Sequence, residues 1–127
     1  MIEFSDKQWA LILGGSSGFG LATAKKLARH GMSVCVVHRD RRGAMARIGE
    51  GFQEIEAHGH GFLALNLDAL SETGRQSALD SLGEVLASSG RVRLLMHSIA
   101  FGNLKPLVPV SENTLRTDSI NALAQKL

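Results

Sequence analysis

With 127 residues, 44% of them hydrophobic and 20% charged, the sequence is long enough to fold as one domain with a hydrophobic core. Its formal net charge of +2, with no basic block longer than the cluster Arg39, Arg41 and Arg42, argues against a nucleic-acid partner. No apolar run approaches the roughly 20 residues that span a bilayer, no signal pattern is recognisable, and the one cysteine permits no internal disulfide, so we expect a cytoplasmic protein without a membrane partner.

Short apolar runs alternate with longer amphipathic runs along the chain, which is typical of strands connected by helices. Residues 9–13 predict a first strand that stops at glycines, and residues 18–29 predict an amphipathic helix. Residues 33–37 predict a second strand. Residues 43–58 predict a second helix, although two interior glycines weaken its helix propensity.

The second half of the chain continues this alternation. Residues 62–67 predict a third strand, and residues 71–88 predict a helix with Ser71 as its N-cap. Residues 92–99 predict a fourth strand, and a last helix is expected to begin near Ser111. The residues expected to face inward from the helix over 71–88 are Leu79, Leu82, Val85 and Leu86.

The order of these elements predicts the fold class. Strands that are apolar over their whole length need cover on both faces. The alternation of four strands and four helices therefore predicts an α/β fold, the N-terminal portion of a doubly wound parallel sheet of Rossmann type. We expect residues 1–127 to form one such nucleotide-binding domain, incomplete by itself.

A glycine-rich loop, residues 14–20, joins the first predicted strand to the first predicted helix. Gly14 allows a sharp turn off the strand, Gly18 lets the backbone approach a phosphate, and Gly20 lets the helix pack closely on the sheet. The free N–H groups of the first helical turn then face a pyrophosphate, with two serine hydroxyls as further donors. The loop residues expected at the cofactor are Gly14, Ser16, Ser17, Gly18, Phe19 and Gly20.

The end of the second predicted strand bears on which dinucleotide is bound. An acidic side chain there binds the 2′-hydroxyl of NAD, whereas an arginine accommodates the 2′-phosphate of NADP. Arg39 lies about 20 residues after the loop, and its planar fork suits a phosphate, with His38 as a neighbouring candidate. Asp40 is the competing carboxylate and would favour NAD if it turned toward the ribose. We therefore expect NADP(H), with NAD(H) as the alternative.

The segment Leu13–Gly20 resembles the Thr-Gly-x-x-x-Gly-x-Gly signature of the short-chain dehydrogenases/reductases, with a leucine in place of the threonine. This resemblance implies a nicotinamide dinucleotide as cofactor and hydride transfer to a small-molecule substrate. It also implies that the end of the third strand contacts the adenine ring. Asn66 and Leu67 match best by their distance from the strand, with Asp68 as the alternative.

At the end of the fourth predicted strand, His97–Phe101 resembles the His-Ser-Ile-Gly-Phe segment of enoyl-acyl-carrier-protein reductases. The resemblance implies that Ser98, Ile99 and Ala100 line the nicotinamide ribose. It also points to an acyl-thioester substrate and to fatty acid metabolism. Enoyl reductases are a divergent branch of the family, whereas the glycine loop resembles that of its classical members. The reduction of a carbonyl and that of an enoyl group therefore both stay open.

The family's chemistry needs a tyrosine that donates a proton and a lysine one turn later, which lowers the pKa of the tyrosine. Asn121, in the last predicted helix, resembles the asparagine that holds a water of this relay; an ordinary helix asparagine is the alternative. The sequence contains no tyrosine, and its fourth strand would be an unprotected sheet edge. We expect an inactive fragment or one piece of a split enzyme.

Other roles for the chain follow from the same features. One alternative is a non-catalytic dinucleotide-binding subunit that completes or regulates a partner polypeptide. For the enzyme itself we expect a homo-oligomer or a complementing polypeptide. His58 and His60 lie in a predicted turn without a third ligand near them, so no metal site is expected.

Overall fold

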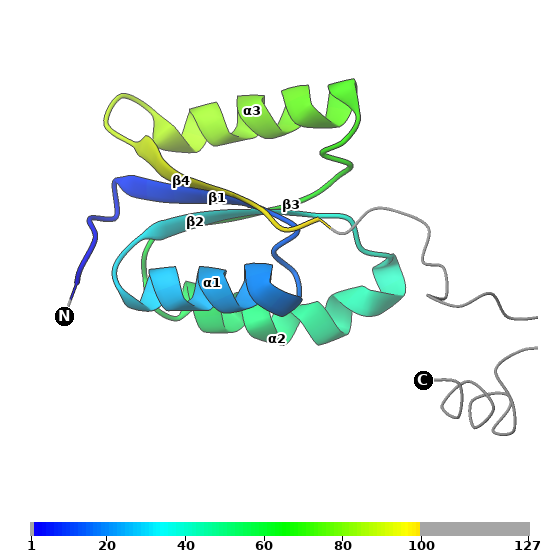
Figure 1. Ribbon diagram of the computed structural model, residues 1–127, viewed down its shortest axis with the longest axis horizontal. Helices are drawn as coiled ribbons and strands as arrows, with labels where there is room; N and C mark the ends of the chain where they lie inside the picture. Colours follow the sequence, from blue (N-terminus) through cyan, green and yellow to red (C-terminus); the bar gives the residue numbers. More distant parts are fainter. Residues whose placement is uncertain (1, 100–127) are drawn as a thin grey trace, which may run out of the picture.

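The sheet of this protein has four parallel strands in the order β3-β2-β1-β4, with helices on both faces (Figure 1). The structure is a computed structural model, and it describes residues 2–99. This arrangement confirms the predicted α/β fold of Rossmann type. The candidate residues Ala100 and Asn121, and the predicted helix from Ser111, lie outside the described residues. The elements are β1 (Gln8–Leu13), α1 (Gly18–Arg29), β2 (Ser33–His38), the 3-10 helix η1 (Arg42–Ala44), α2 (Met45–Glu56), β3 (Phe62–Asn66), α3 (Glu72–Leu86) and β4 (Arg91–His97).

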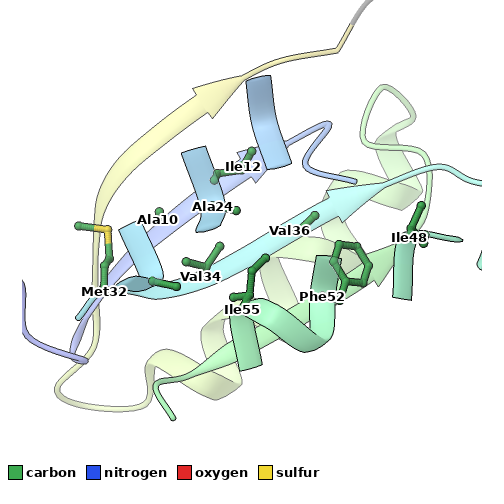
Figure 2. Packing of buried hydrophobic residues seen from close by; sticks show 10 residues of the cluster. Ala10, Ile12, Ala24, Met32, Val34, Val36, Ile48, Phe52 and Ile55 are labelled. Atoms are coloured by element: carbon green, nitrogen blue, oxygen red, sulfur yellow. The ribbon is translucent and has the colours of Figure 1, made fainter. Parts of the chain in front are cut away.

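Helices α1 and α2 cover one face of the sheet, and α3 covers the other (Figure 1). The larger part of the core lies between the sheet and the first two helices, where side chains of β1 and β2 meet Ala24 and Phe52 (Figure 2). A smaller cluster of Trp9, Cys35 and Leu82 lies on the α3 side. All six residues of β2 are buried, because this strand has neighbours on both sides and helices on both faces. The carboxyl end of β2 is therefore firmly held.

The helix boundaries follow from local sequence. Ser71 caps α3 as predicted, since its hydroxyl oxygen accepts a hydrogen bond from the Gly74 backbone N–H at 3.0 Å. Gly31 follows α1 with a φ of +97°, a conformation that strains any residue with a side chain. The second predicted helix begins as the 3-10 turn η1, and its α-helical part starts only at Met45.

Two of the four residues predicted to face inward from α3 do not. The side chains of Leu79 and Val85 are 58% and 41% exposed, whereas Leu82 is buried. The buried stripe of α3 runs through Ala78, Leu82 and Leu86, which are spaced by four residues. Successive residues turn by about 100° around a helix, so Leu79 and Val85 flank this stripe on opposite sides. The periodicity was correct, but the width of the buried face was overestimated.

Strand β4 is the outermost strand on its side of the described sheet and pairs only with β1 there. It spans Arg91–His97, two residues shorter at its end than predicted, so that Ser98 and Ile99 follow it. Leu95 is 66% exposed on this strand. Within residues 2–99, none of the helices combines the length and the hydrophobicity that crossing a membrane requires.

Candidate functional site

A pocket of about 550 Å³ opens at the carboxyl ends of the strands. Strand β2 lies on one side of β1 and strand β4 lies on the other, so the strand order reverses at β1. The pocket lies at the carboxyl end of this strand. Open α/β sheets bind their ligands at such switch points. The lining residues come from the glycine loop and the ends of all four strands: Gly14, Ser16, Ser17, Gly18, Phe19, Val37, His38, Arg39, Asp40, Leu67, Asp68, Ala69, Leu70, Ser98 and Ile99.

The glycines of the loop differ in what they accommodate. A Cβ on Gly14, whose φ is +87°, would collide with the Ser98 backbone carbonyl. A Cβ on Gly20 would collide with the backbone carbonyl of Gly14, so this glycine brings α1 close to the loop, as predicted. Gly18 has a φ of +57°, yet a Cβ there would meet nothing within 4 Å, since it borders the pocket. Gly20 itself is buried and does not line the pocket.

Helix α1 presents its N-terminus to the pocket. Ser17 is its N-cap residue and has an extended backbone, but its side chain makes no capping hydrogen bond. The first intrahelical bond runs from the Leu21 N–H to the Ser17 carbonyl at 3.2 Å. The N–H groups of Gly18, Phe19 and Gly20 precede it and have no acceptor within the helix. These groups, with the helix dipole, make the loop suitable for an anion.

His38 and Asp40 form a pair at the end of β2. Nδ1 of the buried His38 lies 2.9 Å from Oδ2 of Asp40, and its ring packs edge-on against Phe52. The nearby Ser16 hydroxyl, and then the neighbouring His38, hold the pKa of the Asp40 carboxyl below its usual range. The one close side-chain partner of the Asp40 carboxylate among the described residues is therefore the imidazole of His38, a contact that the sequence alone did not reveal.

Arg39, between these two residues, has a side chain that is 75% exposed. Its Nη1 lies 3.4 Å from Oδ2 of Asp68, so the contact is a long, surface ion pair. Such pairs contribute little to stability and exchange readily for another anion. Both Arg39 and Asp40 line the pocket, but the side chain of Arg39 is the more exposed, at 75% against 23%.

At the end of β3, the structure distinguishes the residues that the sequence left as alternatives for the adenine contact. Leu67 and Asp68 line the pocket, and Asn66 does not. The Asn66 side chain instead contacts the backbone of Asp40. Ala69 and Leu70 also line the pocket and were not predicted. The carboxylate of Asp68 accepts a hydrogen bond from the Leu70 N–H at 2.9 Å, a local turn that an Asp at a strand end favours and that could have indicated them.

Other reactive side chains lie away from this pocket or are unsuited to chemistry. Burial raises the pKa of the Cys35 thiol to about 12, so the thiol stays neutral at physiological pH. His97 ends β4 and does not line the pocket. Among residues 2–99, no three His, Cys, Asp or Glu side chains are grouped so as to hold a metal ion.

Comparisons with known proteins agree with this geometry. The family profile described as short chain dehydrogenase matches residues 8–122. A short chain dehydrogenase of Pseudocercospora fijiensis is 33% identical over 105 residues, which are 82% of this chain and 31% of that protein. The peroxisomal 2,4-dienoyl-CoA reductase of Danio rerio is 28% identical over 111 residues, 87% of this chain and 35% of that protein.

A solved structure shows the same likeness. A dehydrogenase/reductase of Sinorhizobium meliloti 1021 superposes with a TM-score of 0.67 at 26% identity, covering 95% of this chain and 43% of that one. The chain thus spans about a third of the length of these curated relatives, as the coverages of 31% and 35% show. The matched part includes the glycine loop and all four described strands.

Proposed function

The chain belongs to the short-chain dehydrogenase family, and on that premise we propose that it is the coenzyme-binding part of an NADP(H)-dependent reductase. Members of this family are oxidoreductases that bind NAD(P). The observation that carries the proposal is the pocket that the glycine loop shares with Arg39. It combines an anion site at a helix N-terminus with the cationic side chain of Arg39, which lines the same pocket.

The described residues fit a dinucleotide. The positive φ and open surroundings of Gly18 leave a backbone cradle that a side chain would fill. In this proposal the amides that follow Ser17 bind the pyrophosphate, and Leu67 and Asp68 lie along the adenine. Ser98 and Ile99 lie beside the nicotinamide ribose. The dinucleotide, when bound, supplies the hydride, and the chain's own residues bind and orient it.

The preference for NADP(H) rests on the contrast between two neighbouring residues. The carboxylate of Asp40 has His38 as a close partner and is only 23% exposed, which disfavours a bond from a ribose hydroxyl. The guanidinium of Arg39 is held only by a long surface ion pair. A 2′-phosphate, with more charge than the Asp68 carboxylate, would displace that pair and take the planar fork.

For the substrate we propose a carbonyl or an enoyl thioester. The likeness of His97–Phe101 to enoyl reductases supports the enoyl alternative, as does the fish relative, whose name states that it reduces a dienoyl-CoA. The residues that would contact a substrate are not among those described. The expected homo-oligomer, the fatty acid metabolism and the cytoplasmic location stay predictions.

A second candidate is a non-catalytic subunit that binds the dinucleotide for a partner polypeptide. It is favoured by one observation, the complete lack of tyrosine in the 127 residues. Both candidates predict that this chain by itself binds the coenzyme without turning it over. In the first candidate, the proton donor of the reaction would come from outside this sequence, and Asn121 would hold a water of the proton relay.

Titration calorimetry with NADPH and NADH at one fixed ionic strength tests the proposal. We expect NADPH to bind more tightly, and Arg39→Ala to remove most of the difference by lowering the NADPH affinity roughly 10-fold. Arg42→Ala, an exposed arginine that does not line the pocket, is the matched control. Equal affinities for the two dinucleotides would contradict the NADP preference, and no heat with either would contradict the dinucleotide site. NADPH oxidation by this chain with an enoyl or 3-oxoacyl thioester would refute the prediction that this chain is inactive by itself.

A further inference from the structure

We propose that Asn66 is a positioning residue that gives Arg39 its reach into the pocket, and so helps to set the preference for a 2′-phosphorylated dinucleotide. This inference rests on the proposed function. It assigns Asn66 a role that differs from the adenine contact expected from the sequence.

The contacts of Asn66 form a two-point clamp on one backbone residue. Its Oδ1 accepts a hydrogen bond from the Asp40 N–H at 3.2 Å, and its Nδ2 donates one to the Asp40 carbonyl at 3.0 Å. Both polar ends of the amide are therefore used by a single residue from the loop after β2. A side chain engaged in this way does not turn toward a ligand without releasing the loop.

The clamp completes a row of bonds between β2 and β3 that brackets Arg39. On one side of it, the Leu67 N–H donates to the His38 carbonyl at 2.8 Å. On the other side, Asn66 holds the backbone of Asp40. The backbone on both sides of Arg39 is thus fixed, while its side chain is exposed. Because the backbone is already held, less backbone entropy is lost when the guanidinium binds an anion.

The same clamp also fixes the direction of Asp40. Its backbone is held by Asn66 while its carboxylate lies 2.9 Å from Nδ1 of His38. Arg39 and Asp40 both line the pocket, so release of the loop would let the carboxylate turn toward a bound 2′-phosphate and repel it. Loss of Asn66 should therefore weaken the binding of a 2′-phosphate and spare the rest of the dinucleotide.

Two measurements on Asn66→Ala test this inference. Hydrogen exchange reads the clamp without any ligand, and we expect the Asp40 amide to exchange faster than in the wild-type chain. Calorimetry reads its consequence. We expect the affinity for NADPH to fall roughly 5- to 10-fold, which corresponds to about one lost hydrogen bond, and the affinity for NADH to change less than about 2-fold. Met45→Leu is the matched control, because it removes the 3.8 Å sulfur contact of Asn66 and keeps the clamp.

A double variant separates positioning from a general structural effect. In the Arg39→Ala background, Asn66→Ala should cause no further loss of NADPH affinity, because the group that it positions is gone. An unchanged exchange rate at Asp40, an equal loss for both dinucleotides, or additive losses in the double variant would overturn the inference. If the wild-type chain binds neither dinucleotide, or binds both equally, the proposed function fails and the inference fails with it. A failure of the inference alone would appear only in the variants, so the two failures are distinguishable.

Discussion

Two Gly→Ala substitutions, at Gly20 in α1 and Gly49 in α2, should change stability in opposite directions. Alanine is the better helix former by about 0.5–1 kcal/mol, so Gly49→Ala should stabilise the protein by that amount, as its Cβ would meet nothing within 4 Å. At Gly20 the Cβ would collide with the Gly14 carbonyl and lie 3.0 Å from the Gly15 Cα. These are backbone atoms that cannot rotate away, so overpacking at the upper end of about 1–3 kcal/mol leaves a net loss of about 2 kcal/mol.

Urea unfolding followed by the fluorescence of Trp9 measures both effects. Trp9 is the one tryptophan of the sequence and is only 6% exposed, so its emission should report the global transition. Gly20→Ala should also weaken dinucleotide binding, since α1 must move away from the glycine loop, whereas Gly49→Ala should leave binding unchanged. A Gly20→Ala variant as stable as the wild type would refute the close packing of α1 on the loop.

Three further predictions concern single residues. Ala87 follows α3 with a φ of +50°, so Ala87→Gly should raise the free energy of unfolding by about 1 kcal/mol in the same urea assay; a loss would contradict the strained backbone. The pKa of Asp40 is lowered in the folded state, so its ionised carboxylate contributes fully to the free energy of unfolding above the ordinary pKa of 3.8. This contribution is lost as pH falls through the folded pKa. The stability deficit of Asp40→Asn relative to wild type should therefore shrink below about pH 4. A deficit that is constant with pH would contradict that ionised contact. The Cys35 thiol, with a pKa of about 12, should react with iodoacetamide at pH 8 only when the chain is unfolded, and rapid labelling of the folded chain would contradict its burial.

The alternation of strands and helices could be predicted because it depends on burial that is visible in the sequence. β2 is buried at every position, and residues 34–37 at its centre form one apolar run. The glycine loop needs specific conformations that few residues adopt. At the end of β3 the sequence could not choose between Asn66 and Asp68. The choice depends on how β3 pairs with β2: Asn66 ends β3 opposite His38 and contacts the backbone of Asp40, whereas Asp68 follows the strand and lines the pocket. That register is a long-range property.

The same limit applies to the charges after β2, where the sequence presents a histidine, an arginine and an aspartate in succession. By sequence, the guanidinium of Arg39 is favoured at the adenosine ribose, with the carboxylate of Asp40 as its competitor. The structure separates them by their contacts: His38 lies 2.9 Å from the carboxylate of Asp40, and Asn66, far away in the chain, holds the backbone of Asp40. In the proposed function, the partners of Asp40 are as important for the choice of dinucleotide as the presence of Arg39.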